Sequence, residues 1–302
     1  MRVTLERANL LKSLNHVHRG VERRNTIPIL TNVLLNADGA SLEMKATDLD
    51  LEITEATPDS VEQAGATTVP AHLLYDIVRK VPDGSEVMLS MDPEGATMTV
   101  ASGRSNFKLQ SLPQSDFPQL AAGEFSHTFR LDSQTMRRLI DRTQFAISTE
   151  ETRYYLNGIY MHTAENDGNI VLRAVATDGH RLARCETEAP DGSENMPGII
   201  IPRKTVGELQ KLVDDPDVAV IVELSDSKIR LTIGAVVITS KLIDGTFPDY
   251  QRVIPQGNDK AMQVDRKIFT DAVDRVSTVS SERGRAVKLA LSEGLLTLSV
   301  NN

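Results

Sequence analysis

The sequence predicts an α+β fold in which one unit of helices and antiparallel strands is repeated along the chain. Three landmarks recur at an offset of about 130 residues: Ala46-Thr47-Asp48 as Ala176-Thr177-Asp178, Val69-Pro70 as Ile201-Pro202, and Phe117-Pro118 as Phe247-Pro248. A third start, at residues 262–273, echoes residues 129–140. Because self-similarity at a fixed spacing is typical of duplicated domains, we predict two whole repeats and part of a third.

The helices are predicted from apolar residues at helical spacing. Leu10, Leu14 and Val17 form one such stripe, which is expected to face a sheet. A Ser or Asp before a stripe is a typical helix start, and Asp132 or Ser133 fits this role in the second repeat. The predicted helices lie at about residues 6–18, 70–80, 132–145, 203–213 and 265–277.

The strands are predicted from turn residues followed by alternating apolar and polar side chains. Residues 38–53 align without a gap on residues 94–109, and both segments begin with an acidic residue followed by Gly. The alternation that follows, from Leu42 in the first segment and Met98 in the second, is the pattern of half-buried antiparallel strands. Each half-repeat is therefore predicted to be a helix plus an antiparallel meander.

Composition is that of an ordinary globular protein. Of 302 residues, 40% are hydrophobic and 25% are charged, and no apolar run approaches the roughly 18 residues of a membrane span. The first residues carry charge where an export signal needs an apolar segment, and Cys185, the single cysteine, has no partner for an internal disulfide. We expect a cytoplasmic protein with no membrane segment, and we interpret Cys185 as a packing residue.

Pro and Gly collect at residues 118–123 and 255–259, as they do in linkers. We therefore expect three domains, at residues 1–122, 123–256 and 257–302, with the third incomplete.

The charge is unevenly distributed. The chain carries a net charge of −9, yet the five predicted helices hold 13 Lys and Arg against 8 Asp and Glu. A positive helical face on an acidic body would attract a polyanion to one surface. On charge alone, the simpler interpretation that these are solvated helix faces is favoured, and both stay open.

A catalytic cluster is the enzyme hypothesis. Asp178 and His180 offer a carboxylate and an imidazole two residues apart, but no His-x-x-x-His, Cys-x-x-Cys or glycine-rich phosphate loop accompanies them. We expect no metal and no cofactor. Ala-Thr-Asp occurs in both repeats and is interpreted as a scaffold turn. The segments special to the second repeat, residues 179–182 and 153–158, are the better functional candidates.

Motifs along the whole chain resemble one family. They are Thr26-Ile-Pro-Ile-Leu, Gly65-Ala-Thr-Thr-Val-Pro-Ala, Ser102-Gly-Arg-Ser, Thr152-Arg-Tyr-Tyr-Leu-Asn-Gly, Ala176-Thr-Asp-Gly-His-Arg-Leu-Ala, Ile201-Pro-Arg-Lys and Phe247-Pro-Asp-Tyr-Gln-Arg-Val. In this order they resemble the bacterial DNA polymerase III beta subunit, the sliding clamp. The resemblance implies three clamp-type domains and a head-to-tail homodimeric ring, with helices lining the hole and sheets outside.

The resemblance also implies a function and its partners. A clamp encircles double-stranded DNA without sequence preference and tethers the replicative polymerase as a processivity factor, with no catalytic site of its own. The implied protein partners are the DNA polymerase III alpha subunit, clamp-loader subunits, and other polymerases or repair proteins, which bind through short linear motifs.

Site residues carried over from the family fall into three groups. The partner-peptide cleft is expected at Leu156, Thr177, Gly179, His180, Arg181, Leu182, Pro248, Arg252 and Val253. DNA contacts are expected at Arg24, Arg153, Tyr154, Tyr155, Arg203 and Lys204. The dimer interface is expected at Leu73, Ile77, Arg104, Asn106, Phe107, Val273 and Val279, with the strand near Val287 to Leu291. His72 stands where a basic DNA contact is expected, which predicts a weaker or pH-dependent contact.

The third unit departs from the family. It supplies about 45 residues and stops at the position equivalent to Ala46-Thr47, so its second helix, its later strands and the tail that completes the cleft are missing. A helix with three strands would leave one apolar face open. We expect the sequence to be part of a longer protein. An open, monomeric DNA-binding adaptor is the remaining alternative.

Overall fold

The computed structural model describes the whole chain except residues 24, 59, 93, 121–122, 281–285 and 302. It divides into two compact units, Met1–Pro248 and Asp249–Asn302. The first unit contains both whole repeats, and the domain boundaries near residues 122 and 257 stay predictions. In the part of the chain that is described, no helix is both long and apolar enough to cross a membrane.

The first repeat begins with a strand and a helix and ends with a meander. Its strands are β1 (Arg2–Glu6), β2 (Asn32–Asp38), β3 (Ser41–Thr47), β4 (Leu51–Pro58), β5 (Ser60–Gln63), β6 (Gly65–Pro70), β7 (Glu86–Met91), β8 (Thr97–Ser102) and β9 (Ser105–Gln110). Its helices are α1 (Arg7–Val17) and α2 (Ala71–Lys80). Both helices and the two aligned strand pairs, β3-β4 and β8-β9, agree with the sequence prediction.

The second repeat follows the same order. Its strands are β10 (His127–Asp132), β11 (Gly158–Asn166), β12 (Asn169–Thr177), β13 (Leu182–Glu188), β14 (Ile199–Pro202), β15 (Ala219–Leu224), β16 (Lys228–Ile233) and β17 (Val236–Lys241). Its helices are α3 (Ser133–Asp141) and α4 (Arg203–Leu212), and a 3-10 segment, η5, covers Glu151–Leu156.

Helix α3 starts as predicted but ends early. The carboxylate of Asp132 accepts the main-chain N–H of Thr135 at 2.6 Å, which is the expected N-cap. The sequence predicts a helix to residue 145, whereas α3 ends at Asp141. The main-chain N–H of Thr143 bonds to the Ile140 carbonyl at 3.0 Å, three residues back instead of four, so the chain leaves the α-helix in a tighter turn.

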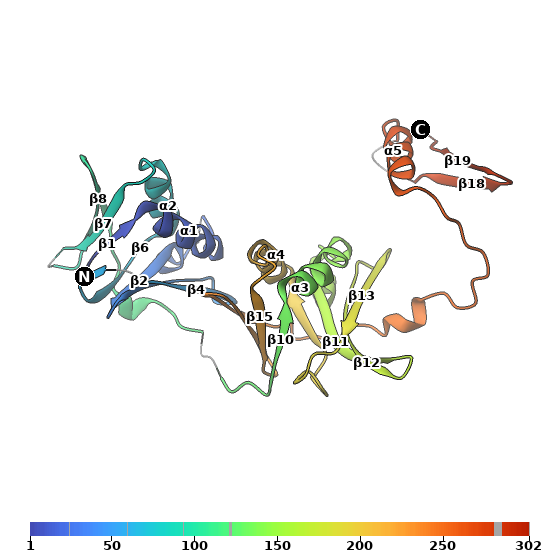
Figure 1. The fold of residues 1–302 in the computed structure, drawn as a ribbon, viewed down its shortest axis with the longest axis horizontal. Coiled ribbons are helices and arrows are strands. Elements are labelled where there is room, and N and C mark those ends of the chain that lie inside the picture. Colours follow the sequence, from blue (N-terminus) through green and yellow to red (C-terminus); the bar gives the residue numbers. More distant parts are fainter. Residues whose placement is uncertain (24, 59, 93, 121–122, 281–285, 302) are drawn as a thin grey trace. The chain divides into compact units, whose positions relative to one another are not determined.

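The two repeats share one sheet (Figure 1). Its eight strands run in the order β10-β15-β16-β17-β4-β3-β2-β6, and β17 of the second repeat pairs antiparallel with β4 of the first, with Ile238 opposite Ile53. The other sheets of the first unit are β5-β1-β7-β8-β9 and β13-β12-β11-β14. Strands β9 and β13 therefore lie at the edges of their sheets. Their counterparts in the other repeat, β17 and β4, pair with each other inside the shared sheet.

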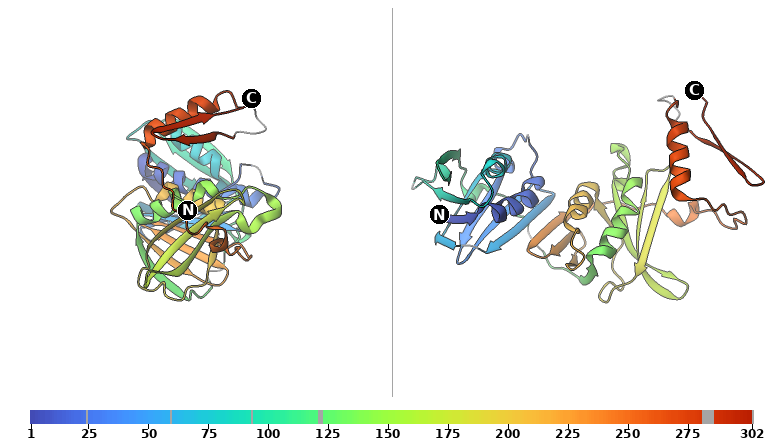
Figure 2. Two further views of the ribbon diagram at one scale, coloured as in Figure 1. Left: turned by 90° about the vertical axis from the view of Figure 1, so that its right-hand side faces the viewer. Right: turned by 45° about the horizontal axis from the view of Figure 1, so that its top comes forward.

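The helices pack on the sheets through the predicted stripes. Leu10, Leu14 and Met136 are fully buried, and burial of a side chain of this size stabilises the fold by ~2 kcal/mol. Helices α1 and α2 lie together in the first repeat and α3 and α4 in the second (Figures 1 and 2). Arg137 and Arg142 are exposed, so the basic face points away from the core as expected.

The second unit contains α5 (Arg266–Ser277), β18 (Lys288–Ser292) and β19 (Leu295–Ser299). None of the α5 residues is buried in this unit, and Ile268 is 71% exposed. Residues 262–265, which echo residues 129–132 of β10, are irregular and form no strand. The corresponding strands β1 and β10 are held by β7 and β15, and no described residue supplies such a neighbour here.

Candidate functional site

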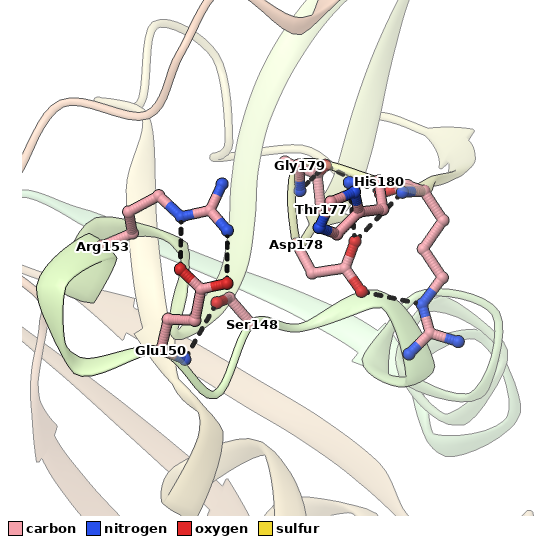
Figure 3. A network of polar contacts seen from close by, with 8 residues as sticks. Ser148, Glu150, Arg153, Thr177, Asp178, Gly179 and His180 are labelled. Carbon is pink, nitrogen blue, oxygen red and sulfur yellow. Dashed lines mark hydrogen bonds and ion pairs between the residues drawn. The ribbon is translucent and has the colours of Figure 1, made fainter. Parts of the chain in front are cut away.

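The loop between β12 and β13 is closed by one carboxylate. Oδ1 of Asp178 accepts the main-chain N–H groups of His180 and Arg181, both at 3.0 Å, and its Oδ2 accepts Nε of Arg181 at 3.0 Å (Figure 3). The hydroxyl of Thr177 accepts the Gly179 N–H at 3.1 Å and donates to the Arg181 carbonyl at 2.7 Å. These bonds fix the backbone of an exposed loop and leave the side chain of His180 outside the turn.

The first repeat contains the same turn. Oδ1 of Asp48 accepts the N–H groups of Asp50 and Leu51 at 3.0 and 2.7 Å, and the hydroxyl of Thr47 accepts the Leu49 N–H at 3.1 Å. The interpretation of Ala-Thr-Asp as a scaffold turn is therefore confirmed. The two residues after the Asp differ between the repeats, and these are exposed at the surface of the turn.

Leu49 occupies the equivalent position of the first-repeat turn with a φ of +79°, so Gly179 is favoured at its position rather than required. The Gly179 φ of +86° lies in the left-handed region, where a Cβ atom is strained. A Cβ at this position would also collide with the guanidinium of Arg153. Arg153 approaches the loop from η5, and Figure 3 shows its guanidinium facing the Glu150 carboxylate. Nε and Nη2 of Arg153 donate to the two carboxylate oxygens of Glu150 at 2.9 and 2.7 Å.

The carboxylates of the site are held ionised. Partial desolvation raises the pKa of Asp178, but the hydrogen bonds from Arg181 and His180 outweigh it, so the pKa is below its ordinary value. The hydrogen bond from Arg153 lowers the pKa of Glu150. The hydrogen bonds that Asp178 accepts come from two main-chain N–H groups and from Arg181, and none comes from the His180 imidazole, which is the bond that the enzyme hypothesis requires. No group of three metal-ligating residues occurs among the residues that the structure describes.

The other predicted cleft residues come from four places. Leu156, at the end of η5, is 3% exposed, and Leu182 is half-buried at the start of β13. Pro248 is exposed and follows Phe247, whose ring stacks on Tyr160 with centroids 4.7 Å apart. Arg252 and Val253 belong to the second unit, and Val253 is 69% exposed. Nε of Arg252 pairs with Asp249 at 2.7 Å.

The predicted DNA contacts lie on η5 and at the start of α4. The main-chain N–H of Arg203 donates to the Asn157 carbonyl at 2.9 Å, which joins these two elements. Tyr154 is 53% exposed and meets the ring of Tyr155 edge-on. Lys204 pairs with Asp48 of the first repeat. Arg24 lies outside the described residues.

Sequence reasoning missed a polar hollow on the helical side. Arg19 after α1, Arg137 on α3 and Lys211 on α4 line a hollow of about 460 Å³. The excess of basic residues in the helices was the available signal, but only the fold brings these three together. His72, in contrast, lies against the protein: its Nε2 is 3.0 Å from the Val21 carbonyl oxygen and its ring meets His18 edge-on at 5.3 Å.

Three of the predicted interface residues meet on the first repeat. Leu73, Ile77 and Phe107 line an apolar hollow of about 210 Å³ between α2 and the β8-β9 hairpin, and Leu73 and Phe107 are 50% and 41% exposed. Arg104 and Asn106 are exposed in the same hairpin. The remaining two, Val273 and Val279, lie in and after α5 of the second unit.

Three family models match the chain in order. They are the N-terminal domain of the DNA polymerase III beta subunit over residues 1–121, its central domain over residues 130–249, and its C-terminal domain over residues 251–302.

Individual relatives are similar over the whole chain. The "Beta sliding clamp" of Caulobacter vibrioides is 51% identical over 302 residues and that of Escherichia coli K12 is 40% identical over 305 residues; each match covers 100% of this chain and 81% of the relative. A solved sliding clamp of Bartonella birtlesii bound to griselimycin is 58% identical with a TM-score of 0.96, covering 100% of this chain and 81% of that one. A Caulobacter crescentus beta sliding clamp, with polyethylene glycol in a proposed beta-motif tethering region, is 51% identical with a TM-score of 0.97, covering 100% and 80%.

Proposed function

The chain belongs to the beta subunits of bacterial DNA polymerase III, the beta sliding clamps, and from that premise we propose which of its surfaces bind which partners. The family is one of processivity factors in DNA replication without catalytic function, and its fold is α+β with three clamp-type domains, the third represented here by residues 251–302. DNA and polymerases are the partners that the family implies.

The Thr177–Leu182 loop is the proposed site for partner motifs. The observation that carries this proposal is a hydrogen-bonded turn that exposes Gly179, His180 and Arg181, residues that the same turn of the first repeat lacks. A fixed loop binds a flexible motif at a lower entropic cost than a loop that must first become ordered. Leu182, half-buried at the start of β13, supplies apolar surface beside the donors, a combination typical of peptide-binding sites, and the family resemblance adds Leu156, which is buried in this structure. Pro248, and Arg252 and Val253 of the second unit, are added to the proposal by the family resemblance alone.

Fluorescence anisotropy with a labelled peptide that carries a polymerase clamp-binding motif tests this site. We expect binding to weaken in His180→Ala and in Arg252→Ala. Asp50→Ala is the matched control, because Asp50 holds the position of His180 in the first-repeat turn. Unchanged affinity in both test variants would remove the assignment.

Duplex DNA is proposed to contact the helical side through charge. Arg153, Tyr154, Tyr155, Arg203 and Lys204, together with Arg24, are the proposed contacts, extended by Arg19, Arg137 and Lys211. Basic side chains that meet phosphates without reading bases permit sliding. Arg153, Lys204, Arg137 and Lys211 each have a carboxylate partner, and Glu208 and Asp214 line the same hollow as the last two. These partners do not prevent DNA contact, since surface ion pairs contribute only ~0–1 kcal/mol.

A second copy is proposed to bind at the open edge of β9. Strand β9 corresponds to β17, and β17 pairs with β4 of the preceding repeat. The same pairing between copies would place a third-repeat counterpart of β4 on β9, beside the apolar hollow of Leu73, Ile77 and Phe107. By this correspondence, the strand that pairs with β9 of the other copy would be one that follows β19. The strand near Val287 to Leu291, which the resemblance also suggested for the interface, corresponds to β2.

The remaining assignments follow from the family. We propose that the partners are the DNA polymerase III alpha subunit, clamp-loader subunits and other polymerases or repair proteins, and that they bind in the cytoplasm, where bacterial DNA is replicated.

A further inference from the structure

A pocket lies at the seam between the two repeats. It has a volume of about 470 Å³, within the range that small ligands and short peptides fill. Leu51 at the start of β4 forms its buried floor, and Leu242 and Ile243, which follow β17, line one wall. The main-chain N–H groups of Leu242 and Ile243 are already bonded to Ser227 and Ile200, so this wall is apolar in character.

The rim of the pocket has an excess of negative charge. Lys204 pairs with Asp48, and Nζ of Lys241 pairs with Asp50 at 2.9 Å, so both cations are neutralised locally. Glu22 also lines the pocket, and no described residue forms an ion pair with it. The uncompensated carboxylate makes this rim attractive to a cation.

The rim is the first-repeat version of the proposed partner loop. Asp48 closes it with the same pair of main-chain hydrogen bonds that Asp178 makes in the second repeat. Where the second repeat presents Gly179 and His180, the first presents Leu49 and Asp50, and Leu49 is 41% exposed. One turn therefore presents a basic surface in one repeat and an acidic, apolar surface in the other.

We propose that this seam pocket binds a short peptide segment in which an aliphatic or aromatic side chain is followed by Lys or Arg. The apolar side chain lies on Leu51, Leu242 and Ile243, and the cation meets the carboxylate of Glu22 at the rim. The inference rests on the proposed function, because it assumes that the duplicated turn binds partners. Its consequence is that one subunit holds two partners of opposite charge at separate turns.

Methyl NMR of the 302-residue chain with two peptides tests the proposal. The probes are acetyl-Leu-Leu-Arg-amide and acetyl-Leu-Leu-Glu-amide, which differ only in the residue that carries the charge. We expect the Arg peptide to shift the methyl signals of Leu242 and Ile243 and to bind about fivefold more tightly than the Glu peptide, as expected for an exposed charge pair. Higher salt should reduce this preference.

Substitutions on the rim provide the second measurement. Glu22→Gln should weaken binding of the Arg peptide by about threefold, and Glu22→Lys should reverse the preference between the peptides. Glu86→Gln, on the exposed face of β7 outside the pocket, is the matched control and should change nothing.

Three results would overturn the proposal: no shift at Leu242 and Ile243, equal affinity for the two peptides, or full affinity in Glu22→Lys. Binding of a polymerase clamp-binding motif to the same samples reports the His180 loop separately. Failure at the seam with normal binding at that loop therefore contradicts only this inference, and the reverse result contradicts only the proposed function.

Discussion

Replacement of Asp178 by Ala isolates what the ordered turn contributes to partner binding. The substitution removes the acceptor of two main-chain N–H bonds and of the Arg181 guanidinium, all at 3.0 Å. The loop remains in the chain with every apolar neighbour unchanged. The expected effect is therefore a less ordered loop, while the apolar surface of the site stays the same.

The magnitude follows from these three bonds. A hydrogen bond contributes a net ~0.5–1.5 kcal/mol, and the low end applies to the two N–H groups because they are at the surface and regain water. The side chain of Arg181 is 58% exposed, so its ion pair adds only ~0–1 kcal/mol. A total of about 1–2 kcal/mol corresponds to a decrease in affinity of about 5- to 30-fold.

Anisotropy titration with a polymerase clamp-motif peptide measures this decrease, and thermal unfolding checks that the core is intact. Asp48→Ala removes the same two main-chain bonds in the first repeat and is the internal control. The reasoning is refuted if Asp178→Ala binds like the wild type, or if Asp48→Ala weakens binding equally.

Three further predictions concern charge, DNA and self-association. Because the pKa of Asp178 is lowered in the folded protein, its turn is stabilised above the ordinary Asp pKa and loses that stability only as the pH falls through the lower value. The affinity difference between wild type and Asp178→Asn should thus stay constant from pH 8 to pH 5 and shrink below; a difference already gone at pH 6 would contradict this. Arg203→Ala with Lys211→Ala should weaken duplex DNA binding and reduce the slope of log affinity against log salt by ~0.9 for each phosphate that is no longer neutralised, and an unaltered slope would exclude both residues as DNA contacts. Phe107→Glu should abolish any self-association seen by sedimentation velocity, since a charge would enter the apolar hollow between α2 and β9, and persistent dimers would place the interface elsewhere.

The duplicated turn shows how much of the site was predictable. Comparison of the repeats identified Ala-Thr-Asp as a scaffold turn and the residues after it as functional candidates. The hydrogen bonds of Asp48 and Asp178 confirm the scaffold turn. The helices were predictable for a similar reason, because an apolar stripe is local information. The early end of α3 was missed, since the change to a tighter turn at Thr143 is a main-chain hydrogen-bond feature that periodicity does not record.

Long-range pairing was not predictable from the residues. Nothing in the sequences of β4 and β17 indicates that they are neighbours, because any two half-buried strands have the same alternation. The seam pocket and the hollow lined by Arg19, Arg137 and Lys211 both depend on how the repeats meet. The orientation of His72 toward the Val21 carbonyl likewise depends on the packing of α2 against the segment after α1.

A crystal structure of the protein with a bound peptide that carries a polymerase clamp-binding motif tests the central claim most directly. The account predicts that the peptide lies along the Thr177–Leu182 loop, with donors from His180 or Arg181 within hydrogen-bond distance and its apolar side chains near Leu156 and Leu182. A peptide bound elsewhere, with this loop free, would contradict the account.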